Sequence, residues 1–123
     1  MISNYIIILF LLLFFDSCYF MIIYKNFNKM IKEITNSNIK LNYITAIITY
    51  LLLAFSLYYF IILPKKSYLD AFLLGLVIFG IYDFSNLTIF EKYNLNLGLI
   101  DTIYGATIFT LITFIINLIK IEK

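Results

Sequence analysis

Four side chains able to bind a cation or carry a proton lie inside otherwise apolar stretches of the sequence: Asp16, Asp83, Asn86 and Asp101. Carboxylate and amide oxygens bind hard cations, and carboxyl groups inside membranes commonly relay protons. The same groups can also hold a small polar ligand. Because a carboxylate near the centre of a bilayer costs about 2.5–3.5 kcal/mol, its presence there needs a reason. These residues therefore form a candidate intramembrane site that binds or relays a cation, a proton or a small polar ligand.

Helical spacing places these residues on shared faces. Asn86 lies four residues after Tyr82 and three after Asp83, and residues at these spacings are neighbours on a helix. Tyr104 follows Asp101 by three residues in the same way. We expect Asp83 to be the central ligand or proton carrier and Asn86 to be its orienting partner. Asp101 is expected to act as a gate near the membrane surface, with Tyr82 and Tyr104 as hydrogen-bonding walls.

The segments that position these residues are long and apolar. The chain has 123 residues, of which 63% are hydrophobic and 13% charged, and a soluble domain of this size would need more polar surface. We expect an all-α integral membrane protein with a single membrane domain over 1–123. It would contain four transmembrane helices in an antiparallel bundle, because a span needs about 20 mostly apolar residues. Four segments meet that rule, at about 5–24, 43–63, 71–90 and 99–119.

The loops add two further expectations. Phe27, Met30, Ile31 and Ile34 recur at helical spacing in loop one, with lysines on the other face. This pattern predicts a short interfacial helix whose apolar face lies in lipid. The turn at Pro64 and the short last loop predict that spans two to four are neighbours. Three glycines would allow close packing between them, namely Gly75, Gly80 and Gly105.

Alternating span directions place the polar residues in one half of the membrane. At 1.5 Å per residue, Asp16 lies roughly 12 Å from the face that carries loops one and three, and Asp83 roughly 10 Å. Asn86 and Asp101 lie roughly 6 Å and 3 Å from the same face. The opposite half of spans one and three holds no charged or amide side chain. The sequence therefore predicts a vestibule open to one side, although its lysine distribution does not decide which side is cytoplasmic.

Composition excludes several classes of site. The chain has no histidine, which argues against haem, blue-copper and histidine-type zinc centres, and we expect no cofactor. Any metal would be a hard cation with oxygen ligands. The single cysteine, Cys18, cannot form an intrachain disulfide, and a net charge of +2 argues against nucleic-acid binding. No known catalytic pattern is present, so an enzyme is the less favoured reading.

Other readings remain open. Asp101, followed by Thr102, fits an N-cap of span four, and Asp83 fits a hydrogen bond that holds two helices together. On that basis the protein is a membrane scaffold or an assembly subunit of a virion membrane. A third reading is an enzyme that acts on lipid headgroups through its carboxylates. Besides the lipid bilayer, the sequence allows a homo-oligomer as a partner, with a pore formed between subunits.

The stretch YDFSNLT at 82–88, followed by DTIYG at 101–105, resembles a two-part motif of a family of small four-helix membrane proteins. This family is catalogued as the 2177 domain-of-unknown-function family. The chain departs from its pattern at Ser85, where the family has threonine, and at Tyr104, where it usually has tryptophan. The resemblance implies the four-helix fold and marks the same polar residues, but it implies no activity. The matching positions are Asp16 with Tyr19 and Phe20, Pro64, Tyr82, Asp83, Asn86, Leu87, Thr88, Asp101 and Gly105.

Overall fold

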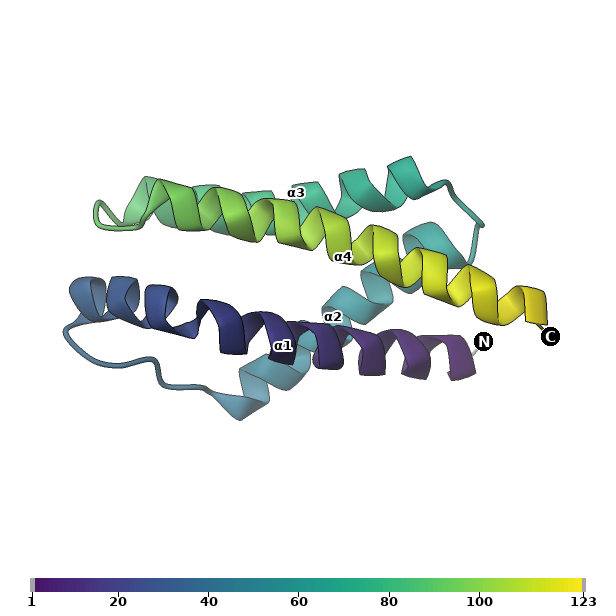
Figure 1. The fold of residues 1–123 in the computed structure, drawn as a ribbon, viewed down its shortest axis with the longest axis horizontal. Helices are drawn as coiled ribbons and strands as arrows, with labels where there is room; N and C mark the ends of the chain where they lie inside the picture. The colour runs from purple at the N-terminus through teal and green to yellow at the C-terminus, as the bar shows by residue number, and fades with distance from the viewer. Residues whose placement is uncertain (1, 123) are drawn as a thin grey trace.

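A computed structural model describes residues 2–122 of the chain, and the side chains of residues 3–119. Within this range the protein is all-helical and has four helices long and apolar enough to cross a membrane (Figure 1). The prediction of an all-α protein with four transmembrane helices is confirmed. The helices are α1 (Ile2–Thr35), α2 (Tyr43–Leu57, extended by a π-helical turn at Tyr58–Ile62), α3 (Tyr68–Ile89) and α4 (Leu95–Glu122).

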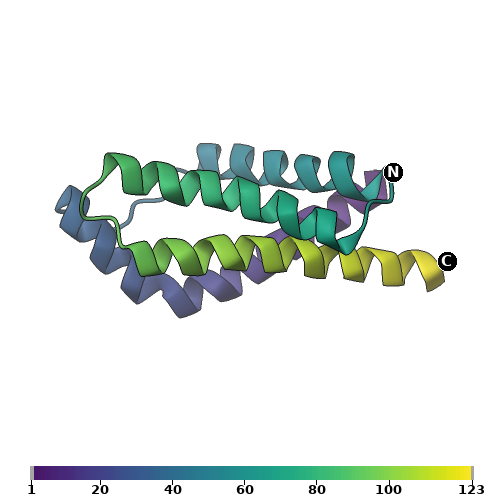
Figure 2. The ribbon, with the colours of Figure 1, turned by 90° about the horizontal axis from the view of Figure 1, so that it is seen from above.

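Each helix runs antiparallel to the one before it in the chain (Figure 1). The α1–α2 and α3–α4 connections lie at one end of the bundle, and both termini lie at the other end (Figures 1 and 2). Helices α3 and α4 pack closely along their length, while α1 packs on α2 and α4. Helices α2 and α3 pack on other helices more than on each other. The expectation that spans two to four are all close neighbours therefore holds for α3 and α4 only.

Helix α1 is longer than a membrane span. Its 34 residues extend over about 50 Å, against about 30 Å for the hydrocarbon core of a bilayer. The separate interfacial helix expected in loop one does not exist as such, because these residues continue α1 to Thr35. Figure 2 shows that α1 changes direction part-way along. Its last turns then lean toward the α3–α4 connection at the same end of the bundle.

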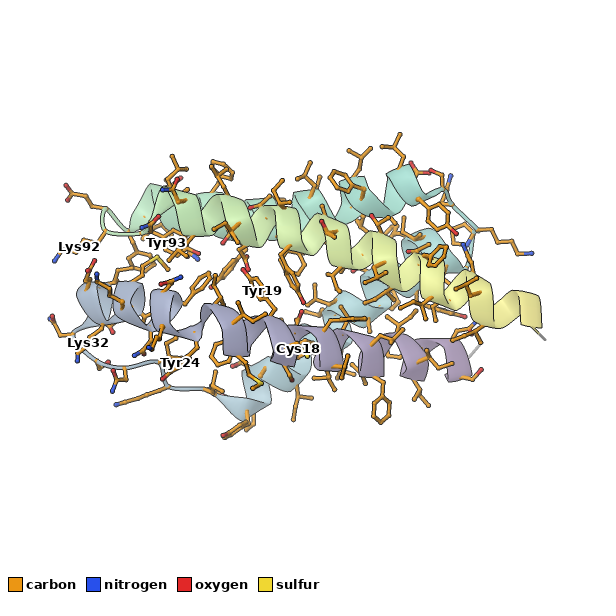
Figure 3. All side chains as sticks on the ribbon, in the orientation of Figure 1. Cys18, Tyr19, Tyr24, Lys32, Lys92 and Tyr93 are labelled. Carbon is orange, nitrogen blue, oxygen red and sulfur yellow. The ribbon has the colours of Figure 1, made fainter. Side chains whose placement is uncertain are left out.

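The apolar face of these last turns of α1 is covered by protein. Met30 is buried and packs with Tyr93 and Leu97, and Phe27 and Ile34 pack against the same cluster. The expectation that this face lies in lipid is therefore wrong. It is wrong because the α3–α4 loop presents an apolar surface that the loop-one pattern alone cannot reveal. Figure 3 shows Tyr93 between the end of α1 and the α3–α4 pair.

Two of the three candidate glycines hold α3 and α4 close together. A Cβ atom on Gly75 would overlap the backbone of Gly105, and one on Gly105 would overlap the ring of Phe79. Small residues allow this close backbone approach in membranes. Gly80 differs, because a Cβ atom there would lie at an ordinary 3.5 Å from Cγ2 of Thr102. Of the three candidate positions, Gly75 and Gly105 therefore require glycine for packing, and Gly80 does not.

The half of the bundle near the termini is filled with apolar side chains. Large residues from three helices are fully buried there, including Leu12, Leu57 and Phe109. This cluster fills the half of the membrane in which the sequence places no charged or amide group on spans one and three. Polar side chains and internal space are therefore left to the half that carries the α1–α2 and α3–α4 connections.

Asn94 begins α4. Its side-chain oxygen accepts hydrogen bonds from the backbone N–H groups of Asn96 at 2.8 Å and Leu97 at 3.2 Å. This is the N-cap arrangement, in which an Asn side chain satisfies donors that have no partner within the helix. Asp101 lies inside α4, so its interpretation as the N-cap of span four is wrong. The helix extends beyond the apolar stretch that defined the predicted span.

Replacing Asn94 with alanine should lower the free energy of unfolding by about 1 kcal/mol, because the first turn of α4 loses its cap. The measurement is reversible unfolding of the purified protein in mixed micelles, followed by circular dichroism. Asn38→Ala is the control, since Asn38 is exposed in the α1–α2 connection and caps no helix. Equal stability of the Asn94→Ala and wild-type proteins would contradict the capping role.

Candidate functional site

A cavity of about 640 Å³ lies between α2 and α3 in the polar half of the bundle. A smaller cavity of about 370 Å³ adjoins it, and the two share Lys40, Tyr82 and Asp101 on their walls. Because α2 and α3 pack mainly on other helices, this space is not filled by their side chains. All four helices and the α1–α2 connection contribute polar walls to the larger cavity, through Asp16, Lys40, Thr45, Tyr50, Tyr82 and Asp101.

Helices α1 and α4 exchange hydrogen bonds at this site. Tyr104 on α4 donates from its hydroxyl group to Oδ1 of Asp16 on α1. Tyr19 on α1 donates to Oδ1 of Asp101 on α4 at 3.2 Å. The two tyrosine rings stack, with centroids 3.8 Å apart and planes within 10° of parallel. Each helix thus supplies an aspartate and, three residues later, a tyrosine. Each tyrosine donates a hydrogen bond to the aspartate of the other helix. Figure 3 labels Tyr19.

Asp83 on α3 is fully buried. Its Oδ1 atom accepts a hydrogen bond of 2.8 Å from the Tyr93 hydroxyl group, and its Oδ2 atom accepts one of 3.0 Å from Thr102. Burial raises the pKa of Tyr93, which lies in the α3–α4 connection, so its hydroxyl group stays protonated and remains a donor. Gly98 makes room for this arrangement, because a Cβ atom there would lie 3.6 Å from Cβ of Asp83. Protein groups alone therefore satisfy the Asp83 carboxyl group.

The remaining predicted site residues lie near these groups. The carboxyl groups of Asp83 and Asp101 are adjacent and interact electrostatically. Asn86 lies next to the hydroxyl groups of Tyr82 and Tyr93. The sequence predicts Asn86 as the orienting partner of Asp83. In the structure, the hydrogen bonds to the Asp83 carboxyl group come from Tyr93 and Thr102 instead. Tyr82 is 59% exposed and forms part of the wall of both cavities.

The chain also matches the model of a known family. A family model described as Predicted membrane protein (DUF2177) matches residues 1–118. The chain belongs to this family. No curated protein and no solved structure matches this chain. The family membership agrees with the four candidate spans, so the chain is an integral membrane protein and a lipid bilayer is its surroundings.

Several residues of the site did not enter the predicted set, among them Tyr19, Lys40, Tyr50, Tyr93 and Thr102. The spacing Asp-x-x-Tyr occurs on both α1 and α4, at 16–19 and 101–104, and this shared spacing is a signal from which their pairing could have been predicted. Tyr93 and Lys40 lie in connections, whose positions hydropathy does not predict. Tyr50, whose hydroxyl group lies next to Asp16, carries no signal in the sequence.

The chemistry of the walls favours an organic cation over a bare metal ion. Among the described residues, no three acidic, cysteine or histidine side chains form a group suited to a metal. A hard divalent cation takes six or more oxygen ligands, whereas Asp16 and Asp101 provide two separate carboxyl groups. Hydroxyl groups and the rings of Tyr50, Phe79 and Tyr82 line the same cavity. Carboxylates with aromatic walls are suited to an amine, because the rings attract a cation and exclude water.

Proposed function

We propose that this protein binds a small ligand carrying a protonated amine in the cavity between α2 and α3. The observation that carries the proposal is the presence of two aspartates, Asp16 and Asp101, on the wall of one large cavity inside the membrane. A volume of about 640 Å³ falls within the usual range for small-molecule sites, about 300–1,000 Å³. The proposed site lies toward the end of the bundle that carries the α1–α2 connection, whose residues Lys40, Leu41 and Asn42 line the cavity.

The hydrogen bonds at the site support this binding mode. Asp16 and Asp101 each accept a bond from one tyrosine at Oδ1, and a carboxyl group has further acceptor positions on its two oxygens. Acceptor positions are thus left for N–H donors of a ligand. The stacked pair Tyr19 and Tyr104 fixes both carboxyl groups before any ligand arrives, and such preorganisation reduces the entropic cost of binding.

Asp83 has a different part in the proposal. Its carboxyl group is fully buried and bonded to Tyr93 and Thr102, so it is a structural anchor that holds α3 to α4 and to their connection. The anchor in turn supports Asp101, which lies beside it. We therefore assign ligand binding to Asp16 and Asp101, and not to Asp83.

The first test is binding of ethanolamine to the purified protein in detergent, measured by ligand-dependent thermal stability. We expect saturable stabilisation by ethanolamine and none by ethylene glycol, in which a hydroxyl group replaces the amine. Asp16→Asn and Asp101→Asn should each weaken binding at least about tenfold, because a hydrogen bond to a charged group contributes about 1.5–3 kcal/mol. Asp70→Asn is the matched control, since Asp70 is exposed in the first turn of α3 at the other end of the bundle.

A scaffold role is the alternative, and one observation favours it. Among the side chains that the structure describes, every buried polar atom has a hydrogen-bond partner, as expected where aspartates only join helices. On this reading ethanolamine has no effect on the wild-type protein, and both asparagine variants change thermal stability or oligomeric state alone. Equal stabilisation of the wild-type and Asp101→Asn proteins by ethanolamine would also rule out the proposed site.

A further inference from the structure

We infer that the ligand is a phospholipid with a primary-amine headgroup, whose ammonium group binds at Asp16 and Asp101 and whose phosphate binds at Lys40. This inference rests on the proposed function and specifies its ligand. It follows from the charge at the mouth of the cavity, from the change in polarity along its length, and from the space between α2 and α3.

Charge is the first observation. Lys40 lies in the α1–α2 connection and contributes to the walls of both cavities, together with Asp101 and Tyr82. A cationic side chain and a carboxyl group therefore face the same space from different elements. A zwitterion with a negative phosphate and a positive ammonium group is complementary to this pair, whereas a simple amine leaves Lys40 without a function. A primary ammonium group also has three N–H donors to share between two carboxyl groups, as the lysine side chain does.

Polarity changes with depth along the cavity. Lys40, Leu41 and Asn42 form its outer wall, and the hydroxyl and carboxyl groups follow. Its inner wall is apolar and includes Leu53 and Ile78. Leu53 lies eleven residues after Asn42, about 16 Å further into the membrane. In a phospholipid the phosphate lies between the ammonium group and the acyl chains. The headgroup must therefore bend at the outer end, with its phosphate at Lys40 and its ammonium group turned toward the carboxyl groups, while the acyl chains follow the apolar inner wall. A water-soluble amine leaves that apolar wall without a partner.

The access route is the third observation. Helices α2 and α3 pack on other helices more than on each other, and the cavity lies between them. Tyr82 belongs to its wall and is nevertheless 59% exposed, so the cavity is open beside this residue. In a bilayer the surroundings of that opening are lipid chains. A phospholipid can therefore place its headgroup in the cavity from the side without leaving the leaflet.

The test uses the full chain in detergent micelles containing added lipid, with apparent affinity measured by thermal stability. Phosphatidylethanolamine should stabilise the wild-type protein at lower concentration than phosphatidylglycerol, which has the phosphate and lacks the amine. Lys40→Gln should weaken phosphatidylethanolamine binding about tenfold but should not weaken binding of free ethanolamine, which has no phosphate and gains from the loss of a positive charge in the same cavity. Asp101→Asn should weaken both. Lys65→Gln is the control, because Lys65 is exposed in the turn after α2 at the other end of the bundle.

The outcomes separate the inference from the proposed function. Ethanolamine binding without preferential binding of phosphatidylethanolamine, or with no effect of Lys40→Gln on lipid affinity, overturns the inference alone. If glycerophosphoethanolamine, which lacks acyl chains, binds as tightly as the lipid, the ligand is soluble and the lipid assignment is wrong. If neither ethanolamine nor the lipid binds, the proposed function itself fails.

Discussion

Replacing Gly75 with alanine should strongly destabilise the protein. The added Cβ atom would overlap the backbone of Gly105 and lie 2.9 Å from Cα of Ala106. Backbone atoms cannot rotate away as a side chain can, so α3 and α4 must separate along their interface. Overpacking of this kind costs about 1–3 kcal/mol or more. The measurement is the free energy of unfolding in mixed micelles, followed by circular dichroism.

Gly80→Ala is the matched control for this experiment. It adds the same methyl group to the same helix, but at 3.5 Å from Cγ2 of Thr102, an ordinary contact distance. Alanine is favoured over glycine in a helix interior by about 1 kcal/mol, so we expect unchanged or slightly higher stability. If both variants lose the same stability, the close approach at Gly75 does not explain the loss. A loss confined to Gly75→Ala would confirm that the α3–α4 interface depends on backbone contact.

Hydropathy predicted the number and type of the helices because a bilayer leaves few alternatives. Backbone groups in lipid must be satisfied within the segment, and long apolar stretches therefore form helices. The bounds were less predictable. Helix α1 continues to Thr35, well past its apolar stretch, and α4 begins at Leu95 under the cap of Asn94. These end turns gain contacts with each other, as between Met30 and Leu97, and such tertiary contacts cannot be read from a single segment.

The sequence also indicated which residues would lie near one another, but not their partners. Asp16 and Asp101 lie on the wall of one cavity, as a shared site requires, and Tyr104 binds Asp16 directly. The donors to Asp83 were missed for a physical reason. Tyr93 lies in the α3–α4 connection, and the position of this connection depends on its packing against α1, as at Met30. The functional assignment of these residues stays a prediction.

The carboxyl groups of the site fall into two kinds, those that line the cavity and the one that is fully buried. Asp16 and Asp101 face a cavity and keep acceptor positions free, whereas Asp83 has no exposed surface and two hydroxyl partners. An anchor of this type fixes the relative positions of α3 and α4, and with them the position of Asp101. Loss of the anchor should therefore reduce stability first, and affect ligand binding only through a displaced Asp101.

Replacing Tyr93 with phenylalanine tests this separation. The variant keeps the ring that packs on Met30 and Leu97 but removes the hydroxyl group that donates to Oδ1 of Asp83 at 2.8 Å. A buried carboxyl oxygen is then left without its partner. We expect the free energy of unfolding to fall by about 1–3 kcal/mol, the range for a buried acceptor that loses its partner. Unfolding and ethanolamine binding should be measured on the same preparations.

Tyr43→Phe is the control, because it removes a hydroxyl group from a tyrosine that is 74% exposed at the start of α2. It should leave stability unchanged. Lower stability of Tyr93→Phe with ethanolamine affinity retained would establish Asp83 as an anchor. The opposite result, unchanged stability with ethanolamine binding lost, would contradict the anchor. It would instead make Asp83 the central ligand that the sequence predicts, and binding would then have to extend from the cavity through Asp101 to the buried carboxyl group.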